Sequence, residues 1–160
     1  MSGITIRDAR WPEDERAAVS FIHGLQEFEH QFEPNRRIDP QVGRDYLAGL
    51  MTRVAENEGR VFIAEYDGAP AGWAVFLVEK DAVYIVEDER PIGYVAELFV
   101  TEKARGAGIG KRLLETCEAE ARARSLKVLM IGVLGKNARA RAVYMAVGFQ
   151  AYSEDLRKHL

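Results

Sequence analysis

The chain has 160 residues, of which 48% are hydrophobic and 29% charged, and its formal net charge is −3. This length and composition are typical of one globular domain, here residues 1–160, and exclude a disordered or fibrous chain. The longest uncharged apolar stretch covers residues 71–78, whereas a membrane-spanning helix needs about 20 apolar residues.

The cysteine content and the first residues favour a reducing compartment. Cys117 is the only cysteine, so no disulfide can form within the chain. The first eight residues lack the apolar segment of a secretory signal. We therefore expect a cytoplasmic protein that has no membrane partner.

The charges are distributed unevenly along the chain. Residues 1–96 contain 10 Lys and Arg against 18 Asp and Glu, whereas residues 97–141 contain 10 against 5. This asymmetry predicts an anionic ligand in the C-terminal half and a cationic ligand near the N-terminal half; charges that merely lie on solvated faces would give the same pattern. The basic excess is too small and dispersed for a nucleic-acid partner.

The first 80 residues predict a strand, two helices and a hairpin, in that order. Residues 4–7 alternate apolar and polar side chains, as a short strand does. Helical patterns run over 12–32 and over 39–58, and each begins with a proline in the first turn. Strands over 61–65 and 72–79 are joined by an Asp-Gly turn.

The last 80 residues predict four further strands and two further helices. The strands are expected over 83–86, 93–100, 127–134 and 149–156. One helix follows a Gly-rich turn at 105–110, and the other begins at the capping residue Asn137. These elements predict a mixed α/β (α+β) domain with a central, mostly antiparallel sheet of six to seven strands, flanked by four helices.

The Gly-rich turn at 105–110 is a candidate anion site. It joins a strand to the start of a helix, where unpaired backbone N–H groups and the helix dipole favour negative charge. Two familiar phosphate motifs do not fit. A Walker A motif fails at Arg105 and Arg112, and a dinucleotide-binding motif lacks its third glycine because the chain has Lys111 and Leu113.

The turn does fit the pattern R-x-x-G-x-G, with Arg105, Gly108 and Gly110. A second segment, 137–149, has the pattern N-x-x-A-x-x-x-Y followed by Gly-Phe. Together with the order of the elements, these motifs resemble the GNAT superfamily of acetyl-coenzyme A (acetyl-CoA) dependent N-acetyltransferases, over essentially the whole chain. Glu102 stands where many members have proline.

The resemblance implies that acetyl-CoA is the cosubstrate. It also implies a sheet that is splayed at the acetyl-CoA site, so that the pantetheine arm pairs with the open strand and a backbone N–H near Val100 stabilises the oxyanion. The residues implied to bind acetyl-CoA are Leu98, Phe99, Val100, Arg105, Gly106, Ala107, Gly108, Ile109, Gly110, Lys111, Asn137 and Tyr144.

Glu97 is the candidate general base. It is the single charged residue in the apolar strand over 93–100, and burial there would raise its pKa towards neutral. The resemblance implies that a glutamate at this position takes the proton of the amine, often through water. The alternative is a carboxylate that faces a solvent-lined groove or pairs with an arginine.

Tyr144 is the candidate general acid. A phenol with a pKa of ~10 can protonate a thiolate whose own pKa is ~8.5. Asn137 is two helical turns away and lies on the same face of the helix, and the resemblance implies that it lies near the cofactor. The alternative for Tyr144 is a core aromatic residue in a short amphipathic helix.

Acidic and aromatic residues are expected to recognise the acceptor. They are Phe28, Glu29, Phe32 and Glu97. Such a set suits a cationic amine, although solvated helix ends would give the same pattern. His23 and His30 have no partner at metal-ligand spacing, so we expect no metal site.

These observations predict an N-acetyltransferase that moves the acetyl group of acetyl-CoA to a primary amine by direct attack in a ternary complex. A small-molecule amine is favoured over a protein, because the sequence shows no appended reader segment. Two alternatives stay open: acetylation of a protein N-terminus or lysine, and a non-catalytic module that binds or senses acetyl-CoA. A homodimer that pairs through the strand over 149–156 is compatible with the resemblance.

Overall fold

The computed structural model describes residues 3–160, which contain five strands and four α-helices. The strands are β1 (Ile4–Asp8), β2 (Arg60–Tyr66), β3 (Ala69–Lys80), β4 (Pro91–Val100) and β5 (Leu129–Ile131). The helices are α1 (Glu15–His30), α2 (Val42–Glu56), α3 (Ile109–Ala123) and α4 (Ala138–Ala146). None of these helices combines the length and the apolar composition that crossing a bilayer requires.

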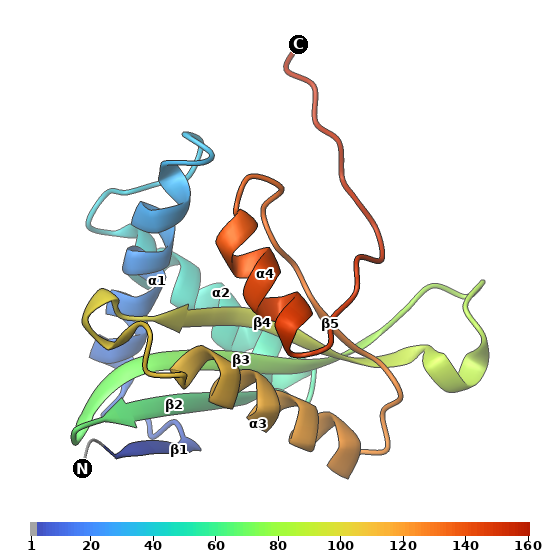
Figure 1. Cartoon of the computed structure of the whole chain (residues 1–160), viewed down its shortest axis with the longest axis horizontal. Helices are drawn as coiled ribbons and strands as arrows, with labels where there is room; N and C mark the ends of the chain where they lie inside the picture. Colours follow the sequence, from blue (N-terminus) through green and yellow to red (C-terminus); the bar gives the residue numbers. More distant parts are fainter. Residues whose placement is uncertain (1–2) are drawn as a thin grey trace.

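The strands form one mixed sheet in the order β1-β2-β3-β4-β5. Neighbouring strands are antiparallel as far as β4, and β5 is parallel to β4. The parallel step requires a crossover connection, which α3 provides. Helices α1 and α2 cover one face of the sheet, and α3 covers the other, with α4 beside it (Figure 1).

Strand β3 is buried on both faces because it lies in the middle of the sheet. Trp73 and Val75 face α1 and α2, whereas Ala74 and Phe76 face α3. Successive side chains of a strand point to opposite faces. The continuous apolar run in this part of the sequence is therefore that of a strand covered on both sides.

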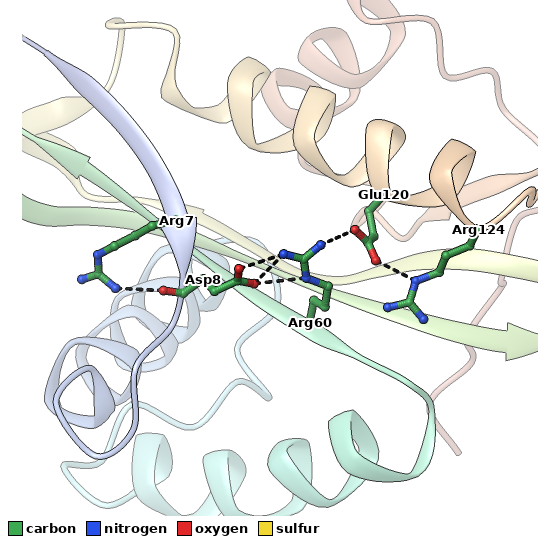
Figure 2. Close-up of polar contacts among 5 residues, drawn as sticks. All are labelled: Arg7, Asp8, Arg60, Glu120 and Arg124. Atoms are coloured by element: carbon green, nitrogen blue, oxygen red, sulfur yellow. Dashed lines mark hydrogen bonds and ion pairs between the residues drawn. The ribbon is translucent and has the colours of Figure 1, made fainter.

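An ionic network ties α3 to the first two strands (Figure 2). Arg60 of β2 donates to both carboxylate oxygens of Asp8 at 2.8 Å and also to Glu120 of α3. Arg124 donates to the other oxygen of Glu120 at 2.7 Å. Arg7 donates to the backbone oxygen of Asp8 at 3.1 Å. These contacts join α3 to the sheet on the face opposite to α1 and α2.

The prediction of a strand over 83–86 is wrong. The pairing of β3 with β4 ends at Lys80 and Pro91, and the residues between them form a loop with a short 3-10 turn. Tyr84 in this loop is 86% exposed. An apolar run forms a strand only where a neighbouring strand and a covering layer are present, and this loop lies on the surface.

The prediction of a last strand over 149–156 is also wrong, so the described sheet has five strands instead of six to seven. Phe149 packs against the ring of Tyr144 with centroids 6.2 Å apart. The chain then leaves the body of the protein (Figure 1), and Leu156 is 90% exposed. The edge that we expected to pair in a homodimer is therefore not formed.

The strand predicted over 127–134 is shorter than expected. Only Leu129–Ile131 pairs with β4. The segment that follows turns towards α4, and residues 132–134 line a cavity instead of extending the sheet. This early end of β5 positions the site described next.

Candidate active site

A cavity of about 850 Å³ opens beside the second half of β4. Its walls come from the end of α1 and the loop after it, from α2, from β4, from the Gly-rich turn with the start of α3, and from the end of β5 through α4. The volume is in the range of sites that enclose small molecules.

The edge of β4 is open towards this cavity. Its parallel pairing with β5 ends at Val95, so residues 96–100 have no strand on that side within the described chain. The N–H of Thr101 donates to the oxygen of Ala71 in β3 at 2.8 Å. The N–H of the preceding residue, Val100, therefore points away from β3 and towards the open edge. An extended ligand can pair with such an edge.

A β-bulge turns Glu97 towards the cavity. Val75 pairs with Glu97, but the next residue of β3, Phe76, pairs with Val95, so Ala96 is an extra residue in β4. Val95 packs on the α3 face of the sheet. The extra residue reverses the alternation of side chains, and Glu97 consequently faces α2 and the cavity.

Glu97 is a buried carboxyl group with an unusual titration. It is 8% exposed, and the phenolic O–H of Tyr46 donates to its Oε1 at 2.6 Å. Burial raises the pKa of Glu97 to about 7; the hydrogen bond from Tyr46 opposes this rise, and the charge of Glu29 adds to it. A carboxyl group that titrates near neutral pH is suited to accept and release protons.

The Gly-rich turn has the backbone conformation of an anion site. Gly106 and Gly108 adopt positive φ angles of 85° and 84°. A Cβ at either position would meet no atom within 4 Å, so the backbone conformation, and not packing, requires glycine. Gly108 is also the N-cap residue of α3, and it has no side chain that could accept a hydrogen bond from the first N–H groups of the helix. The first N–H groups of α3 therefore stay available to an anion.

Helix α4 brings the predicted Asn137 and Tyr144 to the same cavity. The side chain of Asn137 accepts the N–H of Ala140 at 3.1 Å and so caps the helix, as predicted. Burial raises the pKa of Tyr144 to about 12, and the charges of Glu29 and Glu97 contribute to this rise. The phenol therefore stays protonated at neutral pH and can donate its proton.

Most of the residues expected to bind acetyl-CoA line this cavity. They are Leu98, Phe99, Val100, Arg105, Gly106, Gly108, Ile109, Gly110, Lys111, Asn137 and Tyr144. Ala107 is not among the lining residues and packs instead against the apolar cluster on the α3 face. The side chain of Lys111 is exposed and lies 3.7 Å from Glu115.

Arg105 is held by protein groups. Its Nε donates to the backbone oxygen of Val100 at 3.2 Å. Its guanidinium carbon lies 5.0 Å from the ring centroid of Phe28 and 5.8 Å from that of Phe99. The side chain therefore joins α1 to β4 through cation–π contacts next to the Gly-rich turn.

The expected acceptor residues are only partly brought together. Phe28 and Glu29 line the cavity, as Glu97 does, whereas Phe32 does not. The ring of Phe32 packs edge-on against Phe28 at 5.4 Å. Glu29 accepts a hydrogen bond from Nε of Arg36 at 3.0 Å. This carboxylate is therefore partly neutralised within the chain.

Sequence reasoning missed Tyr46 and Arg36, both of which line the cavity. Tyr46 is one helical turn from the buried Val42 and Leu50, and this spacing marks it only as a residue on the inner face of α2. Its partner Glu97 is 51 positions away in the chain. Only the fold brings the two together.

Two histidines of α1 contact the α1–α2 connection. Nε2 of His23 lies 3.2 Å from the oxygen of Ile38, and Nδ1 of His30 lies 2.8 Å from the oxygen of Arg36. No group of three or more His, Cys, Asp or Glu side chains within residues 3–160 is arranged to hold a metal ion.

Known proteins resemble this chain in sequence and in fold. The model of the Acetyltransferase (GNAT) family matches residues 19–149. An uncharacterized N-acetyltransferase from Archaeoglobus fulgidus is 30% identical over 143 residues, which cover 89% of this chain and 84% of that protein. An aminoglycoside N(6')-acetyltransferase type 1 from Stenotrophomonas maltophilia is 30% identical over 107 residues, 66% of this chain and 69% of that protein.

A solved structure extends the likeness to the fold. The crystal structure of a predicted acetyltransferase from Clostridium acetobutylicum with acetyl-CoA superposes with a TM-score of 0.72, at 24% identity, over 98% of this chain and 96% of that chain. The sheet and its covering helices are thus those of a known fold. With the family match and the two sequence relatives, they establish that this chain belongs to the GNAT acetyltransferase family and is an acyltransferase.

Proposed function

We propose that this chain is a single-domain N-acetyltransferase that moves an acetyl group from acetyl-CoA to a primary amine of a small molecule, by direct attack in a ternary complex. One observation carries the proposal: the carboxyl of Glu97, the phenol of Tyr144 and the uncapped start of α3 all line the same cavity. An acyl transfer to an amine needs a base, an acid and an anion site together.

In this proposal, acetyl-CoA binds along the open side of β4. The first N–H groups of α3 and the turn at Gly106 and Gly108 hold the diphosphate, which the helix dipole favours. The pantetheine arm pairs with residues 96–100 as an added strand. The acetyl-CoA complex of the Clostridium acetobutylicum relative supports this cosubstrate.

The chemistry then follows from the lining side chains. Glu97 accepts a proton from the ammonium group of the acceptor, and the electron pair of the broken N–H bond stays on nitrogen. The neutral amine attacks the thioester carbonyl carbon, and the N–H of Val100 stabilises the negative charge on its oxygen. The C–S bond breaks with its electron pair on sulfur, and Tyr144 protonates the thiolate. The nitrogen loses its second proton to solvent, Glu97 releases the first proton to solvent, and Tyr144 is reprotonated from solvent.

The acceptor side of the cavity suits a cationic amine. A free alkylamine has a pKa of ~10.4 and is protonated at neutral pH. Glu29 and Glu97 supply negative charge, and Phe28 supplies an apolar wall. The aminoglycoside acetyltransferase among the relatives acts on a small molecule of this class, which supports a small-molecule acceptor.

A thiol-release assay with acetyl-CoA tests the proposal over a panel of amines. The panel contains aminoglycosides, polyamines, arylalkylamines and peptides with a free N-terminus or lysine. We expect thiol release, and an acetylated product in the mass spectrum, with at least one small amine. Turnover of peptides alone would favour a protein acetyltransferase, and acetyl-CoA binding without release would favour a non-catalytic module. Calorimetry that detects no binding of coenzyme A would refute all three.

A further inference from the structure

The two carboxylate oxygens of Glu97 are not equivalent. Oε1 accepts the O–H of Tyr46 at 2.6 Å. Oε2 has no hydrogen-bond partner within residues 3–160. If it were fully enclosed, it would be a buried polar atom without a partner, but within these residues only Nε1 of Trp73 is such an atom. Oε2 is therefore open to the cavity that Glu97 lines.

We propose that Tyr46 is a positioning residue for Glu97: its hydroxyl engages Oε1 and holds the carboxylate so that Oε2 receives the proton of the acceptor. The O–H bond forms on Oε2 as the N–H bond of the ammonium breaks, and the electron pair stays on nitrogen. This inference rests on the proposed function, in which Glu97 is the base. Tyr46 touches neither reacting atom and keeps its own proton.

The surroundings of Tyr46 keep it a donor. Tyr46 is 38% exposed, yet the partial burial of its phenol raises the pKa well above the usual value, and the negative charge of Glu97 raises it further. Val42 and Leu50, one helical turn away on either side, are buried and fix this face of α2 against the sheet. The hydroxyl therefore comes from a rigid element, which can set the orientation of the carboxylate.

Charged and titratable groups of three helices affect the pKa of Glu97 or interact with its charge. None of them makes a hydrogen bond to Glu97 in the described chain. Glu29 of α1 raises the pKa of Glu97, and Arg53 of α2, itself bonded to Glu79 at 2.9 Å, lowers it. Tyr144 of α4 interacts with the charge of Glu97 as well. Among residues 3–160, Tyr46 is thus the one direct hydrogen-bond partner of Glu97, and its hydroxyl stabilises the ionised carboxylate.

The first test follows the titration of Glu97 itself by NMR, with carbon-13 in the carboxyl groups of glutamate. The signal is assigned by its absence in Glu97→Gln. In Tyr46→Phe we expect the midpoint to move to higher pH by about one unit, because a hydrogen bond to the charged form is lost. A midpoint that stays at its wild-type value would overturn the proposal, whatever the acceptor is.

Tyr94→Phe is the matched control for this experiment. Tyr94 lies in β4, three residues before Glu97, and its own pKa is raised by burial and to a lesser extent by the charge of Glu97. It makes no hydrogen bond to Glu97 in the described chain. Removing its hydroxyl is the same chemical change, and we expect the midpoint to stay in place. An equal shift in Tyr94→Phe would mean that the effect is not specific to Tyr46.

The second test uses the first amine that shows turnover. The acid limb of the pH profile is the rise of kcat/KM with pH as the base ionises. In Tyr46→Phe we expect this limb to move to higher pH, as the NMR midpoint does. We also expect kcat near neutral pH to fall about tenfold, with the KM for acetyl-CoA nearly unchanged. In a Glu97→Gln background, Tyr46→Phe should have no further effect. A general packing defect would lower the melting temperature without moving the limb.

The two proposals fail in distinguishable ways. If Glu97→Gln leaves the acid limb in place, Glu97 is not the base, and the role of Tyr46 falls with it. If Glu97→Gln abolishes the limb but Tyr46→Phe moves neither limb nor midpoint, the proposed function stands and only the positioning role is wrong.

Discussion

Glu97 and Glu120 lie in polar clusters on opposite faces of the sheet, and their pKa values move in opposite directions. Burial raises the pKa of Glu120, but the hydrogen bonds from Arg124 and Arg60 outweigh burial and hold it below its ordinary value. Figure 2 shows both arginines converging on this carboxylate. Glu97, with a phenol in place of a cation, has its pKa raised to about 7 by burial.

The difference shows what separates a structural carboxylate from a candidate for proton transfer. Glu120 has a cation on each oxygen, so it stays ionised and joins α3 to the sheet. Glu97 has one oxygen that is open to a cavity and no ion pair in the described chain, so it can exchange a proton. A buried acid beside a cavity that is left without a cationic partner is a candidate for chemistry.

The largest effect is expected from Glu97→Gln. Glutamine keeps the shape of the side chain but cannot accept the proton, so we expect kcat/KM near neutral pH to fall by about 10²–10⁴-fold. In the wild type, kcat/KM should rise through pH 7 as Glu97 ionises, and the variant should lose this rise. The measurement is thiol release below and above neutral pH; an unchanged rise would assign the base to another group.

The same substitution should stabilise the fold. The pKa of Glu97 lies near 7 in the folded protein against an ordinary value of 4.5, so its ionisation costs stability progressively above pH 4.5 and fully above pH 7. Glutamine removes this cost, at most about 3 kcal/mol above pH 7 and nothing below pH 4.5. Urea unfolding at an acidic and an alkaline pH measures the difference. A variant no more stable than the wild type at alkaline pH would contradict the raised pKa.

A smaller loss of activity is expected from Tyr144→Phe. The ring and its packing against Phe149 remain, while the proposed proton donor for the thiolate is lost. We expect kcat to fall about 10–10²-fold and the KM for acetyl-CoA to change little. Tyr152→Phe, in the exposed C-terminal segment, is the control and should behave as the wild type. Full kcat in Tyr144→Phe would mean that the ring is only a packing element.

The features that local chemistry encodes were predictable from sequence. The positive φ of Gly106 and Gly108 and the cap by Asn137 each depend on residues within a few positions of one another. Such signals locate the candidate anion site and α4 without knowledge of the fold. The single carboxylate in an apolar strand likewise marked Glu97 as unusual.

The features that depend on contacts between distant segments were not predictable. Simple alternation would place Glu97 on the same face as Val95, and only the extra residue Ala96, seen in the register with β3, turns it to the other face. The apolar runs over 83–86 and 149–156 match strands in pattern, but no neighbouring strand pairs with them in the described chain. The sequence pattern indicates a propensity for strand structure, and pairing with a neighbouring strand decides whether a strand forms.

Gly108→Ala is expected to weaken the binding of acetyl-CoA without affecting the chemical step. The positive φ of 84° costs an alanine about 1–2 kcal/mol, and the added methyl group obstructs the approach of a phosphate to the backbone. We expect the KM for acetyl-CoA to rise about tenfold with little change in kcat at saturation. Gly49→Ala in α2, where a Cβ also meets nothing within 4 Å, is the control. Equal KM values for the two variants would contradict the role of the turn.

The smallest effect on activity is expected from a substitution of Glu120. Glu120→Gln should leave kcat/KM within about twofold, because Glu120 lies outside the cavity. It should lower stability near neutral pH by about 1 kcal/mol, since Arg60 is 38% exposed and solvent screens its charge. The pKa of Glu120 is lowered in the folded state, so this loss should vanish as the pH falls and the wild-type carboxyl is protonated.

Glu118→Gln, which breaks only the exposed pair with Arg122, should cost less, and urea unfolding of both variants measures the difference. A loss of activity in Glu120→Gln without a loss of stability would reverse the roles assigned to the two acids.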